Sequence, residues 1–171
     1  MEREERVAIY AGTFDPITLG HLWMIEAGAQ MFDRLIVAVG TNPEKSCYFS
    51  TEDRIEMIQD SVKDIKNVIV DNYTDKFLIK YAEKIGAKYI LRGIRSTADY
   101  EYEKSLSYVN RYLNTEIVTV FILPPRELIE ISSSIVRGLI GPEGWEDVVK
   151  NYVPECVFKK LIEEHKKRTG C

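Results

Sequence analysis

The chain has 171 residues, 45% of them hydrophobic and 29% charged, and its formal net charge is −4. This composition is that of an ordinary globular protein, and the acidic balance argues against general binding of nucleic acid. Three cysteines and two histidines are too few for a disulfide framework or a transition-metal cage, so we expect no metal ligands from the chain itself.

Targeting and membrane segments are not evident in the sequence. The N-terminal residues lack the apolar core of a signal peptide, and no apolar run approaches the roughly 20 residues that cross a bilayer. We therefore expect a cytoplasmic protein that does not contact membranes. The length favours a single domain covering residues 1–171, with no linker or internal repeat.

Five short runs of apolar and β-branched residues predict strands. Each run is nearly continuous rather than alternating, which is typical of strands buried on both faces. The predicted strands are Val7–Ala11, Leu35–Gly40, Asn67–Asp71, Lys88–Arg92 and Ile117–Leu123.

Apolar residues at helical spacing fill the connections between these strands. The four stripes are Leu22, Ile25, Ala29 and Phe32; Ile55, Ile58 and Val62; Phe77, Leu78, Tyr81, Ala82 and Ile85; and Tyr102, Leu106, Val109 and Leu113. Ser50 with Asp53 resembles a capping box, and Gly86 can end the third helix in a left-handed conformation. A helical tail is predicted to begin within Ser132–Ile140 and to resume at Pro154–Lys167.

The alternation of strands and helices predicts an α/β fold. We expect a doubly wound, five-stranded parallel sheet of the Rossmann-like kind, with a helical C-terminal extension. Ligands of such sheets bind outside the carboxyl ends of the strands. Glycines, hydroxyls and basic groups follow four of the predicted strands, in the segments 12–14, 41–45, 92–95 and 131–134. These residue types suit an anionic, phosphate-bearing ligand.

The segment Thr18-Leu19-Gly20-His21 opens the first predicted helix. Backbone amides are unpaired in a first helical turn and the helix dipole is positive there, so phosphate binds readily. Gly20 leaves room for close approach, and His21 adds a directed donor. The alternative is that His21 is a structural first-turn residue bonded to a carbonyl.

Basic and hydroxyl groups elsewhere also have two interpretations each. Arg92 and Arg95 can hold phosphate oxygens in their guanidinium forks, or they can simply neutralise Asp99, Glu101 and Glu103. Lys45 can bind phosphate or be a solvated loop lysine. The serines of residues 132–134 can bind phosphate or merely cap a helix.

Several enzyme classes lack their motifs here. The sequence contains no Gly-x-Gly-x-x-Gly and no Gly-x-x-x-x-Gly-Lys-Ser/Thr, which argues against a dinucleotide oxidoreductase and a P-loop enzyme. No serine or cysteine lies in the setting of an acyl-transfer nucleophile.

Two segments of the chain together resemble the signature motifs of the nucleotidyltransferase superfamily. Thr18–His21 resembles the motif His/Thr-x-Gly-His, and Ile131–Arg137 resembles the motif Ile-Ser-Ser-Ser/Thr-x-x-Arg/Lys. The segments 12–18, 92–103 and 153–155 make the chain most similar to the bacterial phosphopantetheine adenylyltransferases. The similarity covers nearly the whole chain.

This resemblance implies transfer of an adenylyl group from ATP to 4′-phosphopantetheine, with Mg²⁺, by a homohexamer. It implies catalytic roles for His21, Thr13, Lys45 and Arg95. It places the phosphopantetheine phosphate at Thr13, Lys45 and Arg92, and the pantetheine arm near Phe77 or Leu78. The ATP contacts implied are Thr13, Phe14, His21, Gly93, Ile94, Arg95, Glu103, Leu128, Ile129, Glu130, Ile131, Ser132, Ser133 and Ser134.

The chain departs from the family pattern at three positions, where Ala11 replaces a proline, Ser46 a second basic residue and Glu130 an aromatic one. Two other functions stay open from the sequence. One is a nucleotidyltransferase that uses nicotinate mononucleotide or glycerol phosphate as its acceptor. The other is a nucleotide-binding sensor without turnover.

Overall fold

The structure is a computed structural model, and it describes residues 3–41, 46–74 and 77–170. Its sheet has five parallel strands in the order β3-β2-β1-β4-β5. The strands are β1 (Val7–Gly12), β2 (Arg34–Thr41), β3 (Val68–Thr74), β4 (Tyr89–Gly93) and β5 (Val118–Ile122). All five predicted strands and the doubly wound α/β class are confirmed.

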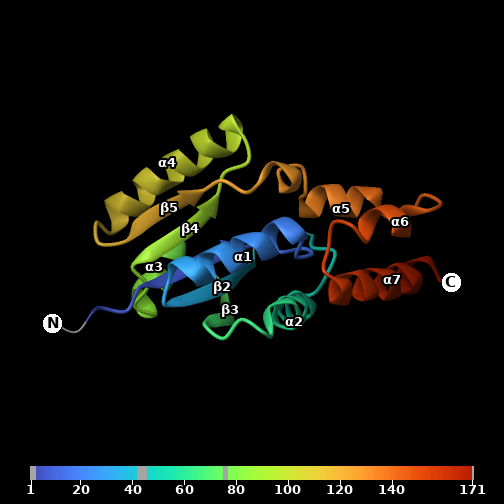
Figure 1. The fold of residues 1–171 in the computed structure, drawn as a ribbon, viewed down its shortest axis with the longest axis horizontal. Coiled ribbons are helices and arrows are strands. Elements are labelled where there is room, and N and C mark those ends of the chain that lie inside the picture. Colours follow the sequence, from blue (N-terminus) through green and yellow to red (C-terminus); the bar gives the residue numbers. More distant parts are fainter. Residues whose placement is uncertain (1–2, 42–45, 75–76, 171) are drawn as a thin grey trace.

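Helices connect the strands and continue beyond the sheet (Figure 1). They are α1 (Leu19–Met31), α2 (Thr51–Val62), α3 (Leu78–Lys84), α4 (Thr97–Leu113), α5 (Ser133–Leu139), α6 (Trp145–Val149) and α7 (Glu155–Thr169), with a 3₁₀ turn at Arg126–Leu128. The predicted helical extension is present as α5 and α7. The five residues of α6 carry too short a pattern for the sequence to predict them. In the part of the chain described, no helix is both long and apolar enough to span a bilayer.

The two faces of the sheet carry separate apolar clusters, which explains the continuous strand patterns. In β1, Ala8 and Tyr10 belong to the cluster that also contains Ile25 of α1 and Ile58 of α2. Val7, Ile9 and Ala11 belong to the other cluster, together with residues of α3. Because successive side chains of a strand point to opposite faces, burial on both faces requires an apolar residue at every position.

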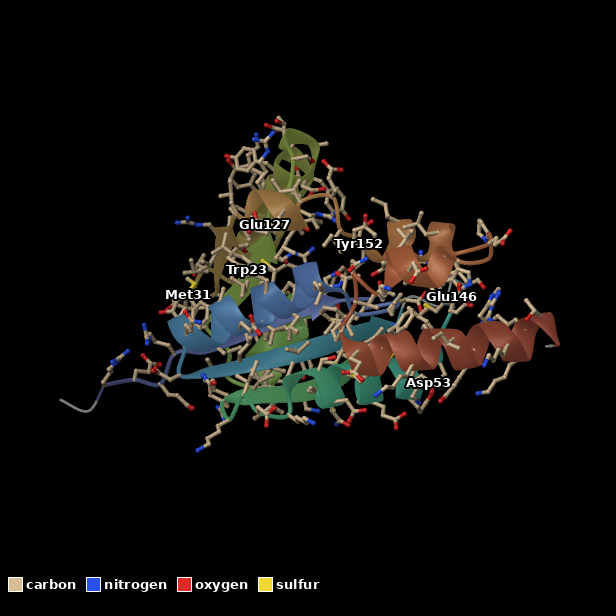
Figure 2. The ribbon with its side chains drawn as sticks, turned by 45° about the vertical axis from the view of Figure 1, so that its right-hand side comes forward. Trp23, Met31, Asp53, Glu127, Glu146 and Tyr152 are labelled. Carbon is tan, nitrogen blue, oxygen red and sulfur yellow. The ribbon has the colours of Figure 1, made fainter. Side chains whose placement is uncertain are left out.

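The C-terminal helix belongs to the first of these clusters. Val157 and Leu161 of α7 are fully buried in it. Lys160 of α7 contacts Asp53 and Glu56 of α2, at 3.3 and 2.5 Å respectively. Figure 2 labels Asp53 where these two helices meet. The extension is therefore packed onto the helices of the sheet.

Helix ends agree with the sequence in part. Gly86 has φ +70° after α3, so the predicted left-handed stop is confirmed. Ser50 caps α2 by accepting from the amide of Asp53 at 3.0 Å. The expected capping box is wrong in its second half, because the Asp53 carboxylate accepts from the Ser50 hydroxyl at 2.7 Å instead. The carboxylate on the short aspartate side chain contacts the Ser50 hydroxyl and not the Ser50 backbone amide.

Two predicted stripes differ in their packing. Phe77 precedes α3 as its N-cap and is 72% exposed, so it does not share the packed face of that helix. Helix α4 has no buried residue, and its apolar stripe faces solvent in the single chain. Helical periodicity predicts an apolar face correctly here, but it does not predict which surface that face covers.

Candidate active site

A cavity of about 530 Å³ lies at the carboxyl ends of β1 and β4. The strand order reverses between β1 and β4. Ligands of doubly wound sheets bind at such a reversal point. Its volume lies within the range of small-molecule sites. The cavity is lined by Tyr10, Ala11, Gly12, Thr13, Phe14, Asp15, Gly20, His21, Met24, Ser46, Cys47, Arg92, Gly93, Arg95, Glu103, Pro124, Leu128, Ile131, Ser132, Ser133, Ser134 and Arg137.

His21 enters this cavity from the first turn of α1. Thr18 is the N-cap of that helix, and its hydroxyl lies 3.4 Å from the amide of His21, which donates to it. In return, the amide of Thr18 donates to Nδ1 of His21 at 3.1 Å. Because Nδ1 accepts a hydrogen bond from the Thr18 amide, we assign the neutral tautomer with its hydrogen on Nε2. Nε2–H is then the donor that remains for a ligand.

The environment of His21 keeps the imidazole neutral. Burial, with a smaller contribution from the charge of Arg95, lowers its pKa from 6.5 to about 4. The ring packs edge-on against Phe14, with centroids 5.1 Å apart. A neutral histidine at pH 7 donates a hydrogen bond without adding a full positive charge.

The turn after β1 forms one wall of the cavity. Phe14 has φ +50°, an uncommon conformation for a residue other than glycine. Gly12 leaves room for the Phe14 ring, because a Cβ at Gly12 would lie 3.0 Å from it. The carboxylate of Asp15, only 3% exposed, accepts from the amides of Tyr48 and Phe49 at 2.7 and 2.9 Å. The turn is thereby tied to the segment that precedes α2.

Two arginines at the end of β4 line the cavity and are also paired. Arg92 donates to both carboxylate oxygens of Glu103, and to the carbonyl of Ala11 at 2.9 Å. Arg95 donates through Nε to Asp99 at 3.1 Å. The neutralising partners considered in the sequence analysis are therefore present for both arginines. Pairing and cavity lining coexist, since each guanidinium has five N–H groups.

The serine segment faces the cavity from the start of α5. Ser132 caps α5 by accepting from the amide of Ile135 at 3.2 Å, and Ser133 donates to the carbonyl of Pro16 at 2.8 Å. Arg137 donates to the carbonyl of Asp15. These contacts attach α5 to the turn after β1, so the two motif segments are held together although they lie far apart in the sequence.

Comparison with known proteins identifies this arrangement. A family model described as cytidylyltransferase-like matches residues 9–139. A phosphopantetheine adenylyltransferase from Chromobacterium violaceum is 50% identical over 155 residues, covering 91% of this chain and 94% of that protein. The chain belongs to the phosphopantetheine adenylyltransferase family. It is a nucleotidyltransferase, as its motifs predict.

More distant members and neighbours extend this result. The phosphopantetheine adenylyltransferase of Caldanaerobacter subterraneus subsp. tengcongensis is 43% identical over 162 residues, 95% of this chain and 99% of that protein. The nicotinic acid mononucleotide adenylyltransferase of Plasmodium falciparum, complexed with NaAD, has a TM-score of 0.70 at 16% identity, covering 95% and 97% of the two chains. That second likeness concerns the fold alone.

The structure gathers most residues that the resemblance to phosphopantetheine adenylyltransferases implies. Those that line the cavity are Thr13, Phe14, His21, Arg92, Gly93, Arg95, Glu103, Leu128, Ile131, Ser132, Ser133 and Ser134. Ile94, Ile129, Glu130, Phe77 and Leu78 are not among the lining residues. Ile94 is buried and its amide donates to Ile122 of β5, while Glu130 is exposed. Lys45 lies outside the described residues.

Sequence reasoning missed three residues that line this cavity or contact its lining. Asp15 and Arg137 stand inside the quoted motifs without an assigned role, and both line the cavity. Arg54 of α2 is only 2% exposed and donates to the carbonyl of Thr13 at 2.7 Å. Its sequence neighbourhood looks like an ordinary helix face, so no local signal could have found it.

Carboxylates of the site are already engaged by protein donors. Asp15 accepts from backbone amides, and Glu103 is paired with Arg92. Over residues 3–41, 46–74 and 77–170, no group of three or more histidine, cysteine, aspartate or glutamate side chains is placed to hold a metal ion.

Proposed function

We propose that the chain transfers the adenylyl group of ATP to 4′-phosphopantetheine, giving 3′-dephospho-coenzyme A and pyrophosphate. The observation that carries this is the neutral His21, fixed by the Thr18 amide and facing a cavity shared with Arg92 and Arg95. The relatives named for this activity support the choice of acceptor.

The chemistry requires positioning more than proton transfer. An oxygen of the acceptor phosphate attacks the α-phosphorus of ATP, a new P–O bond forms, and the bond to the β-phosphate oxygen breaks. The electron pair leaves with pyrophosphate. Because the attacking phosphate is already ionised, no general base is needed, and the site has only to join two anions and stabilise the developing charge.

Each part of the cavity would then have a role. The Nε2–H of His21 and the first-turn amide of Gly20 would donate to ATP phosphates, while the amides of Leu19 and His21 donate within the protein. Arg95, half-exposed at the rim, would add positive charge near the departing pyrophosphate. Thr13 and Arg92, at the ends of adjacent strands, would hold the acceptor phosphate, with Lys45 as a further contact.

Mg²⁺ would enter with ATP as part of the substrate, since the described residues offer no carboxylate cluster of their own. We also propose a cytoplasmic location, following the expectation from the sequence, which fractionation of cells that carry the protein would test.

A homohexamer is proposed as the working assembly. Helix α4 supports an oligomer, because its outward residues include large apolar side chains and none of its residues is buried within one chain. The most exposed are Tyr102 at 64%, Tyr108 at 66%, Val109 at 52% and Tyr112 at 89%. An apolar face of this kind is typical of a contact surface between proteins.

The test is an acceptor comparison. The protein is incubated with ATP and Mg²⁺ together with 4′-phosphopantetheine, nicotinate mononucleotide, glycerol phosphate or pantetheine, and pyrophosphate is measured. We expect release with 4′-phosphopantetheine and none with pantetheine, which lacks the attacking phosphate. Preferential turnover of another acceptor would overturn the substrate, and ATP binding without any pyrophosphate would favour the sensor.

A further inference from the structure

Arg54 of α2 is a buried cation outside both signature motifs. It is 2% exposed, although arginine is seldom fully buried unless its charge is paired. Its Nη1 donates to the carbonyl of Thr13 at 2.7 Å and reaches the carbonyl of Gly40 at 3.5 Å. Nε donates to the carbonyl of Ser50 at 3.2 Å, and Nη2 to the hydroxyl of Thr51 at 2.9 Å.

These partners are all neutral oxygens. Among the residues that the structure describes, no carboxylate forms an ion pair with Arg54. Burying a charge without a counter-ion is costly, and a packed apolar residue would usually be at least as stable. What only the guanidinium fork offers is simultaneous attachment of the end of β1, the end of β2 and the first turn of α2.

The segment that Arg54 attaches is under strain. Phe14 lies at φ +50° between Thr13, whose carbonyl Arg54 holds, and Asp15, whose carboxylate accepts from Tyr48 and Phe49. A non-glycine residue keeps such a conformation only where its surroundings determine it. The turn is held by Arg54 at the Thr13 carbonyl, by the contacts of the Asp15 carboxylate, and by Arg137 at the Asp15 carbonyl.

The strained turn sets the environment of His21. The Phe14 ring packs edge-on against both His21, at 5.1 Å between centroids, and Tyr10, at 5.4 Å. If the turn relaxed, the Phe14 ring would move away from the imidazole, which is half-buried at the cavity wall, and more of that ring would meet water. Thr13, which lines the cavity, would shift with the same turn.

We propose that Arg54 is a positioning residue, which fixes the turn at residues 13–15 so that Thr13 faces the cavity and the Phe14 ring packs against the imidazole of His21. Arg54 itself does not line the cavity. It acts through the backbone carbonyl of Thr13, and its burial follows from attachment of three elements at one point.

The first test needs no turnover. His21 and His165 are the two histidines of the chain, so an NMR pH titration resolves His21 with His165 as internal reference. Burial, chiefly, lowers the pKa of His21 to about 4, with Arg95 as the charge that acts on it. In Arg54→Met and in Arg54→Lys we expect that pKa to rise by at least one unit toward 6.5, since neither side chain can join all three elements.

Two control variants distinguish a positioning role of Arg54 from an effect on overall stability and from an effect of its charge. Ile58→Ala, one turn along α2 and fully buried, should lower the melting temperature without moving the His21 titration. Arg54→Lys keeps the charge, so a rise confined to Arg54→Met would come from charge alone and would overturn the proposal, as would unchanged titrations in both variants. If Arg54→Met does not fold, Arg54→Lys decides.

A kinetic arm rests on the proposed function. Well below the melting temperature, Arg54→Lys should lower kcat for pyrophosphate release by about 10²-fold, the scale of a small misplacement of reacting groups. The KM for ATP should change less than about threefold, and Ile58→Ala should keep kcat. If the wild-type protein releases no pyrophosphate, the proposed function fails while the titration still decides the role of Arg54.

Discussion

The amide of Thr18 donates to Nδ1 of His21 across 3.1 Å, while the amide of His21 lies 3.4 Å from the Thr18 hydroxyl that accepts it. This reciprocal pair is a capping box in which histidine occupies the position usual for glutamate or glutamine. The same contact that caps α1 therefore fixes the histidine tautomer. Helix capping and presentation of the Nε2 donor cannot be separated at this position.

Removing the His21 imidazole should mainly affect turnover. We expect His21→Ala to lower kcat for pyrophosphate release by about 10²–10³-fold, the usual effect of losing one donor to developing charge. ATP binding, measured by calorimetry, should weaken much less. His165→Ala on α7 is the matched control and should keep kcat. An unchanged kcat in His21→Ala would leave His21 with the capping role alone.

The lowered pKa of His21 should also make stability depend on pH. His21 titrates near 6.5 when unfolded and at a pKa of about 4 when folded. Between these values the unfolded chain binds more protons, so this contribution to stability is complete above about pH 6.5 and is lost as the pH falls toward 4. Urea denaturation between pH 7.5 and 4 should show a smaller loss for His21→Asn than for the wild type. Equal losses would contradict the low pKa.

Exposed apolar residues of α4 should hold the oligomer together. Tyr102 and Val109 lie seven residues apart on one face of the helix and are 64% and 52% exposed. We expect the wild-type protein to sediment as a species heavier than one chain at micromolar concentration. Tyr102→Glu with Val109→Glu should shift it toward the monomer, while Val148→Glu on α6, at a residue 43% exposed, should not. A monomeric wild type would refute the assembly.

The C-terminal extension should unfold together with the sheet. Leu161 of α7 is fully buried in the cluster that includes residues of β1 and β2. We expect Leu161→Ala to lower the free energy of unfolding by about 2–5 kcal/mol, the typical effect of such a truncation in a core. Lys159→Ala, exposed on the same helix, should change it by less than about 0.5 kcal/mol. Coincident transitions by tryptophan fluorescence and circular dichroism would support the predicted single domain.

The sequence predicts the sheet well because every buried strand must be apolar at nearly every position. It also predicts the position of the cavity, because glycines, hydroxyls and arginines follow the strands that end there. Long-range contacts are different. Arg54 reaches Thr13 across 41 residues of sequence, and nothing near Arg54 signals that contact. Phe77 fits a helical stripe, yet its position as N-cap of α3 leaves it exposed.

Arg92 offers a sharp test of the acceptor site, because its guanidinium both pairs with Glu103 and faces the cavity where the acceptor phosphate would bind. Its guanidinium is paired with the Glu103 carboxylate and lines the cavity at the end of β4. Burial lowers the pKa of Arg92, but the hydrogen bond and charge of Glu103 outweigh it, so the pKa is raised and the cation is retained. If Arg92 also holds the acceptor phosphate, Arg92→Ala should reduce kcat/KM for 4′-phosphopantetheine by about 10- to 150-fold, the loss of one charge-assisted contact.

The predicted fall in kcat/KM has two sources, the missing contact of Arg92 and the unpaired charge of Glu103, and a second substitution separates them. In Arg92→Ala the Glu103 carboxylate would face two anionic substrates without its partner, so repulsion adds to the missing contact. Arg92→Ala combined with Glu103→Gln should therefore recover part of kcat/KM while remaining below the wild type. ATP affinity should fall little in Arg92→Ala because Arg95 remains. A double variant no more active than Arg92→Ala would show that Glu103 does not repel the acceptor, and a fully active Arg92→Ala would remove Arg92 from the phosphate site.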